Sequence, residues 1–313
     1  MEYRRLGRSG VKIAPLCLGT DNFANPTPKA EAKAMLNRAL DAGINLIDTS
    51  NSYAQGESER IIGRALKENG RRQQVLIATK VHYPTGPGPN ERGNGRLHII
   101  QACEDSLRRL QTDHIDLYQM HRWDATTPVE ETMRALDDLV RSGKVRYIGA
   151  SNYAAWQMAR ANTLAEFRGW SSFVTIQSHY HMLEREVEKE VIPFCQAHGV
   201  GFIPFFPLAG GFLTGKYKRG EGAPAGTRGE RSPYVQGYMT DANYDHVEAM
   251  TAWAEERGHT MAELAHAWLL AQPTVCSVIS GLTKLSHLEA NAKAADWELT
   301  TDEVAEVEKL LGN

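Results

Sequence analysis

Residues 29–48 read KAEAKAMLNRALDAGINLID, and this stretch indicates the fold class. Its first part, residues 29–42, has apolar residues at helical spacing, and Gly43 ends the pattern. The apolar side of this helix comprises Ala34, Leu36, Ala39 and Leu40. Its second part, residues 44–47, is a short apolar run typical of a buried strand. A helix that leads directly into a buried strand predicts an α/β fold.

The same alternation of helix and strand patterns continues along nearly the whole chain. The predicted strands span residues 15–19, 44–47, 75–79, 115–119, 145–150, 173–177, 200–205 and 275–279. Strands joined by crossover helices run parallel, and eight such units close into a barrel. We therefore expect a single (β/α)8 TIM barrel domain over residues 1–313. The competing open doubly wound sheet usually carries a G-x-G-x-x-G motif after an early strand, and this chain has none there.

Two segments fall outside the repeat. Residues 3–16 predict a β-hairpin that turns at Arg8-Ser9-Gly10 and covers the floor of the barrel. The interval between strands seven and eight is the longest, and its residues 211–239 are rich in glycine, proline, lysine and arginine. Long loops in compact domains are usually lids or binding loops, so we expect a lid here. A tolerated surface insertion is the alternative.

One helix start carries a marked signal. Thr127 is placed as its N-cap, Pro128 as its first residue, and Glu130 as the partner that completes a capping box.

Composition excludes several classes of function. The net charge of -3 provides no strong field that would attract nucleic acid or an anionic membrane. No run reaches the roughly 20 apolar residues of a membrane helix, and the residues after Met1 lack the apolar core of a secretory signal. The four cysteines are far apart, which is typical of buried thiols in a reducing compartment. We expect a cytoplasmic protein.

Polar side chains stand at the carboxyl ends of five predicted strands, where the active sites of α/β barrels lie. They are Asp48 and Tyr53, Lys80, His121, Ser151 with Asn152, and Gln177. A tyrosine, with an ordinary pKa near 10, is a weak proton donor at neutral pH. A nearby ammonium would lower that pKa, a carboxylate would keep the ammonium charged, and a histidine would align a carbonyl. The residue types therefore predict proton donation to a carbonyl substrate.

The chain resembles the aldo-keto reductase superfamily, and it is most similar to the bacterial members and the potassium-channel β subunits. The motifs are Leu18-Gly19-Thr20, Ile47-Asp48-Thr49 through Tyr53, Gly56-Glu57-Ser58-Glu59, Ala78-Thr79-Lys80, Asp116-Leu117-Tyr118-Gln119-Met120-His121, Gly149-Ala150-Ser151-Asn152 and the run from Pro207 to Tyr217. They occur in order and cover nearly the whole chain.

The resemblance implies a role for each catalytic candidate. Tyr53 would be the general acid, Lys80 would depress its pKa, Asp48 would pair with Lys80, and His121 would orient the carbonyl. The family transfers hydride directly from a nicotinamide cofactor to the carbonyl carbon, without a metal. NADP(H) is the family's usual cofactor, and NADH is the alternative.

The resemblance also implies a cofactor site. Ser151, Asn152 and Gln177 match the residues that hold the nicotinamide carboxamide, and Phe205 matches the aromatic residue beneath the ring. The segment that matches the pyrophosphate site comprises Phe206, Pro207, Leu208, Ala209 and Gly210, with Lys216 and with Arg228 from the lid. The remaining cofactor candidates are Thr20, Asp21, Asp48, Gly281, Thr283, Lys284, His287 and Asn291.

The adenosine end departs from the family pattern. Ser280 stands in place of the usual proline, His287 in place of the arginine that grips a 2'-phosphate, and Ala290 in place of the adenine-binding glutamate. Thr283 or Lys284 remains available for the phosphate.

Four aromatic residues on predicted rim loops are candidates for the wall of an apolar substrate pocket. They are Phe23, Tyr83, Trp123 and Tyr180. The alternative is that they serve packing. The glycine- and proline-rich residues 85–90 would border the same cleft. The expected substrate is a small carbonyl compound or alcohol, and the sequence predicts no oligomeric state.

Two other classes of function compete with the reductase. One is a redox sensor or channel-type subunit that holds the cofactor with little turnover. Channel β subunits have asparagine at the position of His121, so this residue favours an enzyme. The other is a lyase that uses Lys80 as a Schiff-base nucleophile. That role needs a deprotonated amine, which Asp48 would oppose.

Overall fold

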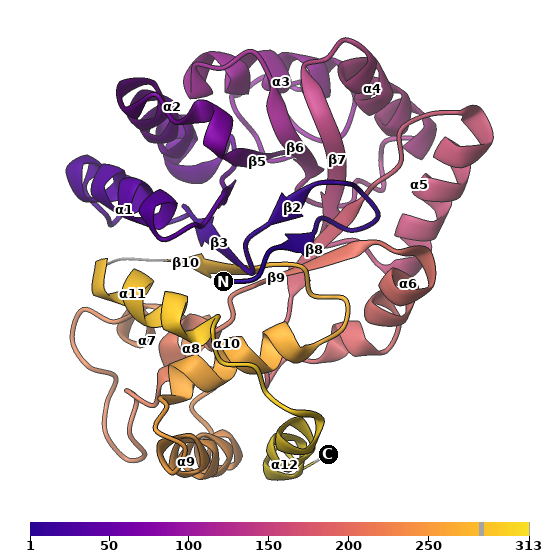
Figure 1. Ribbon diagram of the computed structural model, residues 1–313. Coiled ribbons are helices and arrows are strands. Elements are labelled where there is room, and N and C mark those ends of the chain that lie inside the picture. Colours follow the sequence, from indigo (N-terminus) through magenta and orange to yellow (C-terminus); the bar gives the residue numbers. More distant parts are fainter. Residues whose placement is uncertain (282–284, 313) are drawn as a thin grey trace.

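Eight parallel strands form the central sheet of the computed structural model, which describes residues 1–281 and 285–312. The strands are β3 (Leu16–Gly19), β4 (Leu46–Asp48), β5 (Leu76–Val81), β6 (Ile115–Met120), β7 (Val145–Ser151), β8 (Thr175–His179), β9 (Gly201–Phe205) and β10 (Val278–Gly281). Their order is β10-β3-β4-β5-β6-β7-β8-β9, and a parallel bridge between Phe202 and Val275 links the two edges. The predicted TIM barrel is therefore confirmed (Figure 1).

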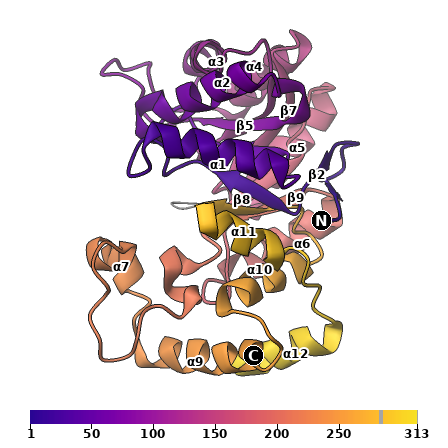
Figure 2. The same cartoon turned by 60° about the vertical axis from the view of Figure 1, so that its left-hand side comes forward.

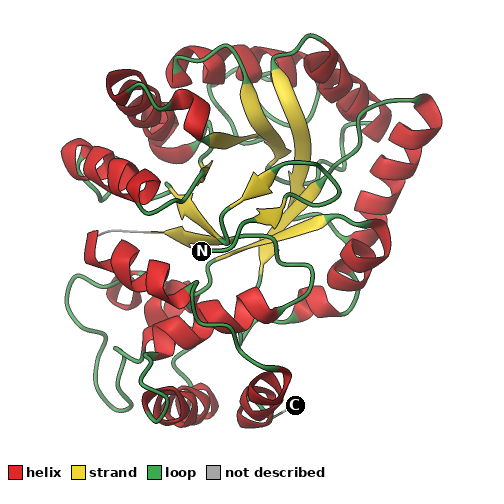
Figure 3. Ribbon diagram, in the orientation of Figure 1, coloured by secondary structure: helices red, strands yellow, loops and turns green. Residues whose placement is uncertain are grey.

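Helices surround this barrel, as the red and yellow elements of Figure 3 show. The helices after β3 to β8 are α1 (Lys29–Asp41), α2 (Glu57–Asn69), α3 (Arg96–Leu110), α4 (Val129–Arg141), α5 (Ala155–Arg168) and α6 (Val191–His198). The longer ones that follow are α9 (Asp241–Glu255), α10 (Met261–Ala271), α11 (Leu285–Ala294) and α12 (Thr301–Leu310). Within the described ranges, no helix has the length and apolar character needed to cross a membrane.

The N-terminal hairpin covers one end of the barrel, as predicted (Figure 1). Its strands are β1 (Arg4–Arg5) and β2 (Lys12–Ile13), which pair antiparallel. Leu6 and Ile13 are fully buried, and they join interior residues of the barrel strands in one hydrophobic cluster. This plug removes the floor of the barrel from water, so the opposite rim is the open end.

The long interval after β9 contains short helices. They are the 3-10 helix η4 (Ala209–Thr214), α7 (Arg228–Arg231) and α8 (Pro233–Gln236). Figure 2 shows α7 on an extended loop at one side of the barrel. From this loop the guanidinium of Arg228 donates hydrogen bonds to Asp21 (3.0 Å) and Asn22 (2.8 Å), beyond the end of β3. The segment thus contacts the rim, as expected of a lid.

Two local predictions were wrong. Helix α4 begins at Val129 with Pro128 as its N-cap, because the Thr127 hydroxyl donates a hydrogen bond to Asp124 (2.8 Å) instead of capping the helix. In α1, Ala34 is exposed and Met35 is buried in its place. At 3.6 residues per turn, position 34 lies on the opposite side of the helix from positions 32, 36 and 39.

Close packing of α2 against the end of α3 requires a glycine. A Cβ added at Gly63 would lie 2.5 Å from the carbonyl oxygen of Arg109 and 2.6 Å from that of Leu110. These are backbone atoms, so a change of side-chain rotamer cannot relieve the contact.

Gly63→Ala is therefore expected to destabilise the fold by about 1–3 kcal/mol, the usual cost of overpacking. Helix propensity alone predicts the opposite sign, a gain of about 1 kcal/mol. Urea denaturation measures the difference in the free energy of unfolding. Lys67→Ala, an exposed change in the same helix, is the control and should not destabilise. A stabilised Gly63→Ala protein would contradict the packing.

Candidate active site

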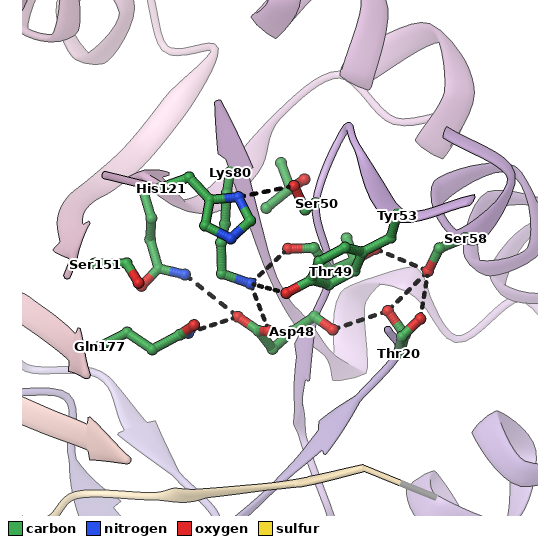
Figure 4. Close-up of polar contacts among 12 residues, drawn as sticks. Thr20, Asp48, Thr49, Ser50, Tyr53, Ser58, Lys80, His121, Ser151 and Gln177 are labelled. Atoms are coloured by element: carbon green, nitrogen blue, oxygen red, sulfur yellow. Dashed lines mark hydrogen bonds and ion pairs between the residues drawn. The ribbon is translucent and has the colours of Figure 1, made fainter. Parts of the chain in front are cut away.

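The predicted rim residues converge at the open end of the barrel (Figure 4). Asp48 ends β4, Lys80 lies near the end of β5, and His121 directly follows β6. Parallel pairing aligns Asp48 with Ala78 and Lys80 with Gln119, which brings the strand ends to one level. The structure therefore brings together residues separated by up to 129 positions in the sequence, as between Asp48 and Gln177.

The centre of the site is the ammonium of Lys80, whose side chain is fully buried. Its Nζ donates hydrogen bonds to Asp48 Oδ2 at 2.6 Å, the Thr49 carbonyl at 2.9 Å and Tyr53 Oη at 3.1 Å. All three protons of the ammonium are thus used. A buried charge is tolerated only when it is paired and hydrogen-bonded in this way.

Burial adds an effect on the acid–base properties of this pair that the sequence analysis did not include. Burial raises the pKa of Tyr53 to about 12, and the neighbouring Lys80 ammonium opposes this effect only in part. The lysine's own effect on the pKa of Tyr53 is downward, as the sequence analysis expected, but burial outweighs it and the net shift is upward. Burial alone would lower the pKa of Lys80, but Asp48 and Tyr53 together raise it. Near pH 7 the phenol is neutral and the ammonium is charged.

Two amides hold the second oxygen of Asp48. Its Oδ1 accepts hydrogen bonds from Gln177 Nε2 at 2.8 Å and from Gln119 Nε2 at 3.3 Å. The sequence analysis missed Gln119, which is fully buried in β6. The signal was a glutamine between Tyr118 and Met120 in an otherwise apolar strand end, where a buried amide needs a polar partner.

His121 lies beside this cluster and is neutral at working pH. Burial lowers its pKa to about 2, and the charges of Lys80, His82 and Arg122 add to the effect. Its ring makes edge contacts with Tyr83, at 4.7 Å between centroids, and with Tyr53, at 6.0 Å. Its Nδ1 lies 3.2 Å from the hydroxyl oxygen of Ser50, another residue that the sequence analysis passed over.

An unusual turn positions Tyr53. Ala54, Gln55 and Gly56 all have left-handed backbone conformations, with φ of 46°, 56° and 83°. The side chain of Arg109 packs where a Cβ at Gly56 would lie, so glycine is required there. The hydroxyl of Ser58 donates to the backbone of Thr20 at 3.0 Å, which anchors the turn to the neighbouring loop.

The carboxamide candidates lie next to the catalytic cluster. Asn152 adopts a left-handed φ of 54°, and its amide donates to the His121 carbonyl (3.1 Å) and to the Ser151 hydroxyl (2.9 Å). Gln177 is held by Asp48, as described above. Ser151, Asn152 and Gln177 therefore form one polar edge beside His121.

Phe205, the candidate platform for the nicotinamide ring, is partly exposed. The ring of His179 stacks on it, with centroids 5.5 Å apart and an interplanar angle of 16°. Tyr234 of α8 places its hydroxyl 2.9 Å from His179 Nδ1. This contact from the lid was not expected from the sequence, because 55 residues separate the two partners.

The candidate pyrophosphate segment has an unusual backbone. Phe206, Ala209 and Gly210 have φ of 65°, 47° and 66°, and Pro207 and Leu208 lie between them. Turns that mix left- and right-handed residues can form concave anion sites from backbone N–H groups. Here the Ala209 N–H donates to the Phe206 carbonyl at 3.0 Å, and Pro207 has no N–H. The Lys216 side chain packs against Gly211 in the same turn. The guanidinium of Arg228 lies over the Phe206 ring, 5.7 Å from its centroid.

The adenosine end has fewer candidates among the described residues. Thr283 and Lys284 lie outside the described residues. Asn291 is buried, and its amide donates to the Ser280 hydroxyl at 2.5 Å, so it braces the strand end. His287 is exposed on α11, and Gly281 ends β10 close to Asp21. Thr20 is buried, and its hydroxyl donates to the Asp48 carbonyl at 2.9 Å.

Two of the four substrate candidates are core residues instead. Tyr180 is fully buried, packs against Phe202 and Trp268, and donates a hydrogen bond to Glu188 at 2.6 Å. Phe23 is also fully buried within the main hydrophobic core. The sequence placed both residues on rim loops, but their side chains turn inward into the core.

The other two substrate candidates remain. Tyr83 and Trp123 are partly exposed, and Tyr83 contacts His121 directly.

Comparison with known proteins agrees with this architecture. The aldo/keto reductase family profile matches residues 15–311. An uncharacterized oxidoreductase, YrpG, of Bacillus subtilis is 40% identical over 96% of this chain and 92% of its own. A probable voltage-gated potassium channel subunit beta of Arabidopsis thaliana is 38% identical, over 95% and 92%. L-glyceraldehyde 3-phosphate reductase of Escherichia coli K12 is 35% identical, over 99% and 92%. The chain therefore belongs to the aldo/keto reductase family.

Proposed function

We propose that this oxidoreductase reduces an aldehyde or ketone to an alcohol with NADP(H), and that Tyr53 is the general acid. The observation that carries the proposal is the hydrogen-bonded chain from Asp48 through Lys80 to the Tyr53 hydroxyl. That chain ends at a neutral phenol whose ring contacts His121.

Each side chain has a distinct part in the reaction. A reduced nicotinamide bound in this site supplies the hydride that reaches the carbonyl carbon. Tyr53 donates its proton to the carbonyl oxygen, which becomes far more basic as negative charge develops on it. The Lys80 ammonium, 3.1 Å from Tyr53 Oη, stabilises the phenolate that remains. Neutral His121 offers a ring N–H to the same oxygen and aligns the carbonyl.

Several features support a dinucleotide as the cofactor. The polar edge of Ser151, Asn152 and Gln177 suits a carboxamide, which both donates and accepts hydrogen bonds. The left-handed turn from Phe206 to Gly210, with Lys216 nearby, suits a pyrophosphate. Among the described residues, His287 is the candidate to bind the 2'-phosphate of NADPH, and it stands in place of the family's arginine. NADH is therefore retained as the alternative cofactor.

Tyr83 and Trp123 are proposed to border the substrate. Both are partly exposed, and Tyr83 contacts His121. An aromatic wall of this kind favours a small carbonyl compound with an apolar group.

A cofactor-holding sensor or regulatory subunit is the second candidate. It is favoured by the resemblance to proteins named as probable potassium channel β subunits. His121 and the complete Tyr53–Lys80–Asp48 chain favour an enzyme instead. A panel of aldehydes and ketones with NADPH and with NADH separates the two, because a sensor would bind cofactor tightly without turnover.

The lyase alternative loses support. The raised pKa of Lys80 keeps its amine protonated, and a protonated amine is no nucleophile.

Tyr53→Phe is expected to lower kcat for reduction of 4-nitrobenzaldehyde by NADPH by at least about 100-fold, since it removes the hydroxyl that donates the proton. Cofactor affinity, measured by fluorescence titration, should stay within a few-fold of wild type. Near-normal turnover by this variant would exclude the assigned mechanism.

Lys80→Met is expected to abolish turnover and to destabilise the fold by about 3–5 kcal/mol, because Asp48 is left buried without its cation. The double variant Lys80→Met, Asp48→Asn removes that unpaired charge, so it should recover much of the stability without the activity. Urea denaturation and the carbonyl assay provide the two readouts. A double variant with restored turnover would show that the ammonium is dispensable.

The pH profile tests the raised pKa of Tyr53. Reduction needs the protonated phenol, so activity is present below that pKa and is lost as the pH rises through it. With a pKa of about 12 for Tyr53, kcat/KM should show no loss from this group between about pH 6 and pH 9. Tyr53→His should move the descending limb below neutrality, because burial and the Lys80 ammonium would lower the pKa of an imidazole there from its ordinary value near 6.5. A wild-type limb near pH 7 would contradict the assignment.

A further inference from the structure

The packing around His121 does not determine which of its two ring nitrogens carries the proton. The neutral imidazole carries a single N–H, on either Nδ1 or Nε2. Tyr53 and Tyr83 hold the plane of the ring by edge contacts, and the Asn152 amide holds the backbone of His121. None of these contacts selects a tautomer, so the partner of the ring nitrogens decides which one carries the proton.

That partner is a pair of serine hydroxyls in the loop after β4. Ser50 Oγ lies 3.2 Å from His121 Nδ1 and 2.9 Å from Ser52 Oγ. The backbone N–H of Ser52 also donates to Ser50 Oγ, at 3.3 Å. Among the described residues, Ser50 makes the one hydrogen-bonding contact with the His121 ring. Ser50 is fully buried, so bulk water does not replace it.

A hydroxyl differs from the usual carbonyl or carboxylate partner of a histidine. Those groups only accept, and they therefore place the proton on the nitrogen that faces them. A serine hydroxyl can donate. One lone pair of Ser50 Oγ accepts the Ser52 N–H at 3.3 Å. When the Ser52 hydroxyl donates across the 2.9 Å contact to Ser50 Oγ, the Ser50 proton is directed at His121 Nδ1.

The other ring nitrogen faces the reacting atoms. Figure 4 shows Nδ1 directed toward Ser50 and the second nitrogen directed toward Lys80 and Tyr53. The Lys80 ammonium uses all three protons on Asp48, Thr49 and Tyr53, so it has none left for His121. A carbonyl oxygen beside Tyr53 is an acceptor, and it can be bound there only by a nitrogen that carries a proton.

We infer that Ser50, assisted by Ser52, is a positioning residue that fixes His121 as its Nε2–H tautomer. The inference rests on the proposed function for its consequence, the alignment of the carbonyl, but the tautomer is a property of the protein itself. Ser50 acts through His121 and does not touch the substrate. The neutral state of the ring, with a pKa of about 2 for His121, is consistent with this role.

The direct test is the tautomer of His121 in the NADP+ complex, observed by ¹⁵N-edited NMR of the protein labelled at histidine. The wild-type ring should show protonated Nε2 and a hydrogen-bonded, unprotonated Nδ1. Ser50→Ala removes the donor to Nδ1, so a mixture with the Nδ1–H tautomer should appear. The variant should lose kcat by roughly 10-fold with little change in KM, the order expected for one lost hydrogen bond.

A matched pair of variants separates hydrogen bonding from packing. Thr and Val have nearly the same shape, so Ser50→Thr should retain the Nε2–H tautomer while Ser50→Val behaves like Ser50→Ala. Ser52→Ala should have a smaller effect, since its backbone N–H remains. If the added methyl group prevents either larger variant from folding, the spectrum of Ser50→Ala decides alone.

The two levels of the proposal fail separately. A wild-type complex with the proton on Nδ1, or a Ser50→Ala spectrum unchanged from wild type, would overturn the role of Ser50 whatever the activity. A protein without carbonyl turnover whose tautomer still responds to Ser50 would overturn the proposed function and leave the role of Ser50 intact.

Discussion

The site depends on one buried ion pair, that of Lys80 with Asp48. An ammonium without access to water needs a counter-charge and a partner for every proton, and Asp48, Thr49 and Tyr53 fill those places. The carboxylate in turn accepts hydrogen bonds from two amides, Gln119 of β6 and Gln177 of β8. Removal of either charge would leave the other buried and unpaired, so four strands are coupled through this pair.

The barrel aligns the residues of the ion pair and shields them from water. Parallel strands deliver their carboxyl ends to one rim, and the hairpin with Leu6 and Ile13 closes the other end with apolar side chains. This closed floor keeps the dielectric low around Lys80. The same burial raises the pKa of Tyr53 and lowers that of His121, so both remain neutral beside a charged lysine. Burial therefore keeps Tyr53 and His121 neutral, whereas Asp48 and Tyr53 keep Lys80 charged against the effect of burial.

The contacts that hold the lid differ in kind from those of the catalytic cluster. Val235 of α8 is fully buried in the main core beside Gly210. Other lid contacts are exposed and polar, as between Arg228 and Asp21, or aromatic, as between Tyr234 and His179. Exposed pairs of this kind contribute about 0–1 kcal/mol each, far less than a buried pair. The lid over the segment from Phe206 to Gly210 therefore combines buried apolar packing at Val235 with exposed polar contacts at Arg228.

The sequence by itself determined the barrel, the hairpin and the identity of the residues at the rim. Apolar periodicity and turn residues are local signals, and the end of a parallel strand predicts which side chains share an edge. Only the tertiary structure decided the net direction of the Tyr53 shift, the inward turn of Phe23 and Tyr180, and the partners Gln119 and Ser50. Each of these depends on burial or on contacts between segments far apart in the chain. A local pattern carries no information about how much water a folded neighbour excludes.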